Sequence, residues 1–214
     1  MKNILFLFIL SSTTALSQPE RRAIQITHYV LDTFYNGTIL MKSGQKEDYM
    51  LNYNTLTHEM IFERAGERLA IAQPEEVDTV YINNRKFVYA NKMFYEVLAT
   101  TPVPLFIEYI GSIIKAGSEI GYGMMSSTTG SNGVSSLIQG GKMYDLHLPY
   151  DYKVKVKKEY WLRKGFNYYK ANNAKHIIEV FPDKEKLIRD LIKKNKTDFS
   201  KPEDITALVV EIQS

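Results

Sequence analysis

The chain has 214 residues, a formal charge of +3 at pH 7 and no cysteine. This nearly balanced charge gives no reason to expect a nucleic-acid partner. The missing cysteines exclude disulfides, thiolate zinc sites, cysteine nucleophiles and the lipidated cysteine of a bacterial lipoprotein.

The first seventeen residues have the pattern of an export signal. Lys2 carries a positive charge, an apolar run extends from Ile4 to Leu10, and Ala15-Leu16-Ser17 is a small-x-small cleavage pattern. The apolar run is too short to cross a bilayer core of about 30 Å, so we expect cleavage after residue 17 and no transmembrane segment. The exported protein would lack cysteine, which favours the periplasm or the outer-membrane surface.

The sequence pattern of residues 24 to 115 predicts short strands separated by turns. Asn36-Gly37 predicts a type I′ hairpin that joins residues 26–35 to 38–41, because both residues tolerate positive φ. Gly44, Gly66, Asn83-Asn84 and Gly111 are further turn candidates. The remaining strands are expected at 49–53, 60–64, 69–72, 77–82, 86–89, 94–98 and 105–110. The fold class is therefore mainly β, an antiparallel meander forming a rolled sheet or open barrel, and α+β once the C-terminal helices are included.

Residues 117–141 interrupt this pattern with seven glycines and many small polar residues. Their low apolar content predicts a long flexible loop. Gly121-Tyr122-Gly123 matches no phosphate-binding pattern, so we expect no nucleotide there. A further strand is expected at 143–148.

The next segment is rich in lysine and tyrosine. Lys153 to Lys157 alternates lysine with valine, as an exposed edge strand does, and a hairpin is expected around Lys164-Gly165. Residues 151–196 hold fourteen Lys and Arg against six Asp and Glu. This excess indicates either a docking face for an anionic partner, such as lipid headgroups or an acidic protein, or ordinary solvated charge. The candidates for a binding surface are Lys153, Lys155, Lys157, Tyr160, Trp161, Tyr168 and Tyr122.

The C-terminal segment, residues 173–214, predicts two or three amphipathic helices that pack on the β domain of residues 18–172. Apolar residues repeat at helical spacing at 177–181, 187–192 and 205–212, and the first of these helices should end at Pro182. Ser200 and Glu203 fit a capping box, with Pro202 in the first turn.

Catalytic and cofactor signatures are missing from the sequence. His28, His58, His147 and His176 show no metal-ligand spacing, and no serine lies in a nucleophile-elbow pattern. We therefore expect no metal, no cofactor and no assigned catalytic residue.

Seven short phrases of the sequence lie at residues 51–54, 77–82, 85–88, 94–98, 121–123, 181–184 and 194–196. Together they resemble a family of exported, uncharacterised proteins of the Bacteroidetes group of Gram-negative bacteria. The resemblance implies the compartment, the periplasm or the outer-membrane surface, and carries no activity, cofactor or catalytic residue.

Three functions remain open from the sequence. The first is a non-catalytic envelope protein that binds a partner protein or a surface component, with peripheral contact to a membrane as one form of such binding. The second is a carrier that encloses a small apolar ligand or lipid in a rolled sheet. The third is a hydrolase whose catalytic residues form no recognisable motif.

Overall fold

The computed structural model describes residues 28–115, 119–120, 124–125 and 152–214. The predicted export signal, His147, Tyr122 and the strand expected at 143–148 lie outside these residues, as does most of the segment 117–141. Four residues of that segment form two short paired strands, β9 (Glu119–Ile120) and β10 (Met124–Met125).

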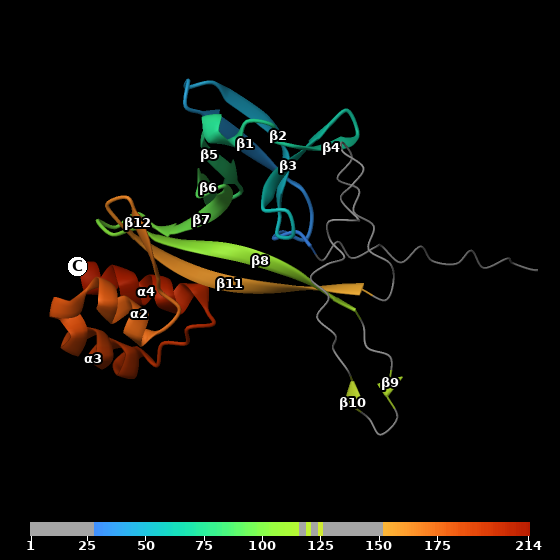
Figure 1. Cartoon of the computed structure of the whole chain (residues 1–214). Coiled ribbons are helices and arrows are strands. Elements are labelled where there is room, and N and C mark those ends of the chain that lie inside the picture. The colour runs from blue at the N-terminus through green and yellow to red at the C-terminus, as the bar shows by residue number, and fades with distance from the viewer. Residues whose placement is uncertain (1–27, 116–118, 121–123, 126–151) are drawn as a thin grey trace, which may run out of the picture.

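The described fold is a ten-stranded antiparallel sheet with three C-terminal α-helices, so the predicted α+β class is confirmed (Figure 1). The strand order is β12-β11-β8-β7-β6-β5-β1-β2-β3-β4. The strands are β1 (Tyr35–Met41), β2 (Lys46–Asn54), β3 (Glu59–Arg64), β4 (Glu67–Ala70), β5 (Val77–Ile82), β6 (Arg85–Ala90), β7 (Met93–Ala99), β8 (Leu105–Lys115), β11 (Tyr152–Lys164) and β12 (Asn167–Lys170). A short 3₁₀ helix, η1 (Pro74–Glu76), precedes β5.

Tight turns account for the meander. Ala65 and Gly66 (φ 53° and 82°) join β3 to β4, and Asn91 and Lys92 (φ 49° and 66°) join β6 to β7. Positive φ at both central residues matches the right-handed twist of antiparallel strands. The turn expected at Asn83-Asn84 also joins two strands, β5 and β6.

The hairpin predicted at Asn36-Gly37 is wrong, because both residues lie inside β1. Gly37 is paired on both sides, with Tyr49 of β2 and Ile82 of β5. A Cβ atom there would lie 2.3 Å from the Tyr81 carbonyl oxygen, so glycine is required by close packing of neighbouring strands and not by a turn. The chain turns later, at Gly44 (φ 89°).

The sheet curls so that one of its faces is concave and encloses the core. β2 and β7 are separated by three other strands in the sheet, yet Tyr53 of β2 contacts Phe94 of β7, with ring centroids 6.4 Å apart. The β2–β3 turn reaches β8, where the Gly111 N–H donates to the Thr55 carbonyl at 2.8 Å. Gly111, expected at a turn, instead lies within β8, and a Cβ there would lie 2.4 Å from Thr55 Oγ1.

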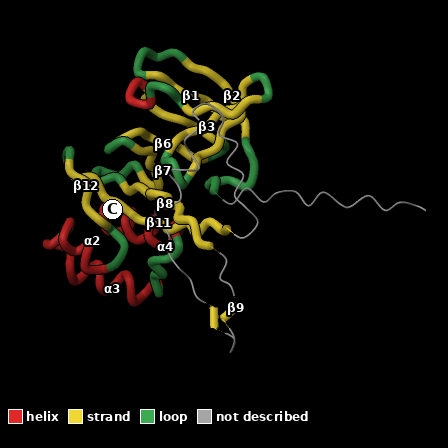
Figure 2. The backbone as a smooth tube through the Cα atoms, turned by 45° about the vertical axis from the view of Figure 1, so that its right-hand side comes forward, coloured by secondary structure: helices red, strands yellow, loops and turns green. Residues whose placement is uncertain are grey.

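The helices pack against the concave side of β7, β8 and β12 (Figures 1 and 2). They are α2 (Ala174–Val180), α3 (Glu185–Asn195) and α4 (Pro202–Gln213), with the 3₁₀ helix η2 (Pro182–Lys184) before α3. Leu105 and Leu162 of the sheet share one buried core with Ile177 of α2 and Leu208 of α4. The three predicted apolar repeats therefore bury most of their residues within this chain, while Leu187 of α3 remains 42% exposed.

The capping box predicted at Ser200 is wrong. The N-cap of α4 is Lys201, with no side-chain hydrogen bond, and Pro202 occupies the first turn. The Ser200 hydroxyl instead donates to Asp198 at 2.7 Å, while the Asp198 N–H donates to Asp204 at 2.9 Å. The Ser200 hydroxyl therefore bonds to Asp198 in the preceding loop instead of capping α4.

Candidate functional site

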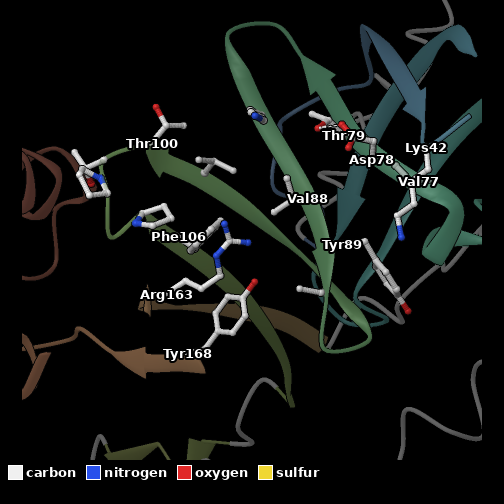
Figure 3. A pocket seen from close by; sticks show the side chains of 16 residues that line it. Lys42, Val77, Asp78, Thr79, Val88, Tyr89, Thr100, Phe106, Arg163 and Tyr168 are labelled. Atoms are coloured by element: carbon white, nitrogen blue, oxygen red, sulfur yellow. Dashed lines mark hydrogen bonds between the residues drawn. The ribbon is translucent and has the colours of Figure 1, made fainter. Parts of the chain in front are cut away.

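A cavity of about 520 Å³ lies on the outer face of the sheet, opposite the helices (Figure 3). Side chains alternate between faces along each strand, so Lys86 and Val88 of β6, Val97 of β7 and Phe106 of β8 all point outward here. The loop between β7 and β8 and the β11–β12 hairpin form further walls. The volume is in the range of small-molecule sites.

Cationic groups border the cavity from three separate parts of the chain. Lys42 comes from the β1–β2 turn, Lys86 from β6 and Arg163 from β11, against one carboxylate, Asp78 of β5. Figure 3 shows Arg163 beside Phe106 and Tyr168 at one end, and Lys42 beside Val77 away from them. The cavity therefore has an excess of positive charge that extends along its length.

None of these three cations forms an ion pair with a described residue. The Arg163 guanidinium lies over the Phe106 ring, 5.5 Å from its centroid, which leaves its N–H groups free to donate to a ligand. Asp78 accepts a hydrogen bond from the Thr79 hydroxyl at 2.8 Å. Three cations that form no ion pair with a described residue, against one lining carboxylate, are suited to an anionic ligand.

Aromatic rings hold the Arg163 end of the cavity in place. Tyr168 stacks on Tyr95 with centroids 5.5 Å apart and contacts Phe106 at 5.7 Å. Tyr95 and Phe106 are buried although they lie on the outer face, because Tyr168 covers them. The backbone N–H of Arg163 donates to the Pro104 carbonyl at 3.1 Å. Arg163 and Tyr168 are therefore positioned by contacts that need no ligand.

The last helix fixes the β7–β8 loop that borders the cavity. Gln213 of α4 accepts a hydrogen bond from the Val103 N–H at 2.8 Å and donates to the Thr101 hydroxyl and the Val103 carbonyl, both at 3.0 Å. Thr101 and Pro102 line the cavity. The helical segment thus supports the binding face from the opposite side of the sheet.

The sequence-predicted surface is placed only partly on this face. Tyr168 lines the cavity, and the register of β11 puts Lys155, Lys157 and Trp161 on the same outer face. Trp161 is already engaged, since its Nε1 donates to Glu108 at 2.8 Å and Lys170 lies over its ring at 5.5 Å. Lys157 is paired with Glu159 at 2.5 Å.

Tyr160 does not belong to this surface, because it points to the concave face and is 2% exposed. Its burial raises the pKa of the phenol to about 12. Lys153 pairs with Ile114 in the β-ladder, but its side chain is outside the described part, and Tyr122 is outside it altogether.

Sequence reasoning did not single out Lys42, Lys86 and Arg163 as site residues. They lie far apart in the chain, and each is an ordinary lysine or arginine in or beside a strand. The one local signal is Thr100-Thr101-Pro102-Val103-Pro104, a loop sequence that two prolines restrict.

A second polar cluster lies on the concave face. Arg85 Nε and Nη2 donate to the Glu96 carboxylate at 2.7 and 2.5 Å, and the Tyr109 hydroxyl donates to it at 2.6 Å. Burial and the Glu96 charge raise the pKa of Tyr109, so its hydroxyl remains a donor. Arg85, Glu96 and Tyr109 are all hydrogen-bonded to one another, as in a structural network. No acid or base of this cluster is left without a hydrogen-bond partner.

Among the described residues, no cluster of three or more His, Asp or Glu side chains could hold a metal ion. None of the described helices is long and apolar enough to cross a membrane. Comparison with protein-family models, with curated proteins and with solved structures found no match.

Proposed function

We propose that this protein is a non-catalytic, exported envelope protein that binds a partner protein or surface component through acidic groups of that partner. The observation that carries the proposal is the outer-face cavity of about 520 Å³ with Lys42, Lys86 and Arg163 beside it and no ion pair for any of them within the described chain. The export signal in the sequence supports the compartment.

The charge of the cavity favours an anionic ligand over an apolar one. A carrier of apolar molecules needs a cavity lined mainly by hydrophobic side chains, with few polar groups. Here cations lie along the cavity together with hydroxyl groups such as that of Thr79. We therefore propose acidic partner binding and do not extend the proposal to an apolar carrier.

The experiment is a mild cross-linking capture from intact envelopes with the tagged native protein and two double variants. Lys42→Gln with Lys86→Gln removes two charges from the cavity. Lys186→Gln with Lys193→Gln removes two charges from the exposed surface of α3 and serves as the matched control. Mass spectrometry identifies what each form captures.

We expect the cavity variant to lose the captured component, or to bind it about tenfold more weakly, while the control retains it. Both variants should fold normally, because none of the four lysines forms an ion pair with a described residue, although the Lys86 side chain is half-buried. Equal loss in both variants would mean that general positive charge is responsible, and equal retention would remove the cavity from the binding function.

A further inference from the structure

The hairpin between β11 and β12 carries one fully exposed aromatic side chain. Phe166 is 100% exposed, whereas the other large exposed hydrophobic residues among those described are between 36% and 42% exposed. It occupies the turn with Gly165 (φ 63°), between the paired residues Lys164 and Asn167. Such a turn requires glycine at its first central position and accepts a small polar residue at its second. The phenylalanine is therefore not explained by the turn.

The residues around Phe166 are basic and aromatic. Residues 162–170 contain Arg163, Lys164 and Lys170, two tyrosines and no acidic residue. Lys170 is paired with Glu159 at 3.2 Å, but Arg163 and Lys164 form no ion pair with a described residue. Lys164 Nζ donates a hydrogen bond to the carbonyl of Val180, the last residue of α2, at 3.5 Å. The hairpin thus combines one exposed apolar ring with two cations that have no carboxylate partner among the described residues.

We propose that this hairpin tip inserts Phe166 into the headgroup region of an anionic phospholipid bilayer, with Arg163 and Lys164 at the level of the phosphates. A single ring on a projecting turn fits a soft interface, because lipid headgroups rearrange around it. A stable protein interface needs a broad complementary surface of about 800 Å² on each partner. Aromatic side chains beside lysine and arginine are the usual combination at membrane surfaces that bear negative charge.

This contact goes beyond the proposed function and has a consequence for it. Arg163 belongs both to the hairpin and to the lining of the cavity. Insertion of Phe166 would place that end of the cavity against the bilayer surface. The protein would then present its outer face to components that are attached to or embedded in the same membrane.

The test measures binding of the chain from residue 18 to residue 214 to phosphatidylcholine vesicles with and without phosphatidylglycerol, by co-sedimentation. The main variant is Phe166→Asn, because asparagine suits the turn and the fold should be unaffected. Leu187→Ala is the control, since it removes an exposed apolar side chain from α3 (42% exposed). A Phe166→Trp variant reports insertion by quenching from brominated lipids, with the Trp161 signal of the native chain subtracted.

We expect the native protein to bind only the vesicles that contain phosphatidylglycerol, and to bind them less at higher salt. Phe166→Asn should weaken binding at least about tenfold, while Leu187→Ala should leave it unchanged. Any of four results would overturn the proposal. These are no vesicle binding by the native protein, equal binding to neutral vesicles, equal binding by Phe166→Asn, and unquenched emission from the tryptophan of the Phe166→Trp variant. Because Phe166 does not line the cavity, vesicle binding and envelope capture report on membrane contact and on partner binding separately.

Discussion

Arg85 and Lys86 are neighbours in β6, and the alternation of the strand sends them to opposite faces of the sheet. On the concave face Arg85 is bonded to Glu96 and Tyr109. On the outer face Lys86 lines the cavity without an ion pair to a described residue. The Arg85 charge is thus neutralised within the fold, while the Lys86 charge has no counter-charge among the described residues.

This difference gives each face a separate experimental signature. A buried ion pair that loses one partner leaves an uncompensated charge in a medium that solvates it poorly. When an exposed cation is removed, only the surrounding water has to rearrange, so the stability of the fold changes little. Substitutions on the concave face should therefore change stability, and substitutions beside the cavity should change binding.

The largest effect is expected for Glu96→Gln, which leaves the Arg85 guanidinium partly buried without its carboxylate. We expect the free energy of unfolding to fall by about 3 kcal/mol, measured by urea denaturation. The matched control is Glu185→Gln on α3, whose partner Arg189 lies one helical turn away on the exposed surface at 2.7 Å. That change should cost less than about 0.5 kcal/mol. Similar costs for the two variants would show that the concave network is not structural.

A buried base without a counter-charge extends the comparison. His28 is buried, its Nε2 has no hydrogen-bond partner among the described residues, and its carbonyl accepts hydrogen bonds from the Thr55 N–H and hydroxyl, both at 2.8 Å. Burial, with a smaller contribution from the Arg68 charge, lowers the pKa of His28 from 6.5 to about 4. In the unfolded chain the imidazole takes up its proton at higher pH than in the folded protein.

Stability should therefore fall as the pH falls from 6.5 to 4, because the unfolded state binds the additional proton throughout that range. We expect a loss of about 2 kcal/mol from this residue. Carboxylates titrate in part of the same range, so the measurement is the difference in urea stability between the native protein and His28→Gln at each pH. An identical pH dependence of the two proteins would contradict the assignment.

The strands were predictable because local patterns determine them. β5 was expected at its observed bounds, Val77–Ile82, since apolar residues and the following Asn83-Asn84 turn both mark it. Gly37 and Gly111 were misread as turn residues because each admits atoms of a segment distant in the sequence, Tyr81 of the paired strand β5 at Gly37 and Thr55 of the β2–β3 turn at Gly111. These contacts depend on strand pairing and on the curl of the sheet, which no local window of sequence contains.

The candidate site on the outer face was only partly predictable for the same reason. Alternation along β11 correctly separates the lysines from the valines, but it places Tyr160 and Trp161 on opposite faces, so they cannot both belong to one exposed surface. Lys42, Lys86 and Arg163 come together only when β1, β6 and β11 are arranged in one sheet. Strand order is a property of long-range pairing, and the sequence pattern does not specify it.

A smaller loss of stability than for Glu96→Gln, and the sharpest division between the faces, is expected for Glu159→Gln. Glu159 lies on the outer face and is paired with Lys157 at 2.5 Å and Lys170 at 3.2 Å. The hydrogen bond from Lys157, together with that from Lys170, lowers the pKa of the Glu159 carboxyl below 4.5 although its partial burial opposes this. The stabilisation is therefore present near neutral pH and is lost as the pH falls through the lowered pKa.

Both lysine side chains are largely in water, with 65% and 48% exposed, so solvent screens the pair although the carboxylate itself is 9% exposed. We expect Glu159→Gln to cost about 1 kcal/mol in urea denaturation at pH 7, less than Glu96→Gln, because exposed lysines are rehydrated easily once the carboxylate is gone. A cost equal to that of Glu96→Gln would mean that burial of the carboxylate alone determines the penalty. The exposure of the cation would then be irrelevant, and the two faces would not differ in the way that their charges are stabilised.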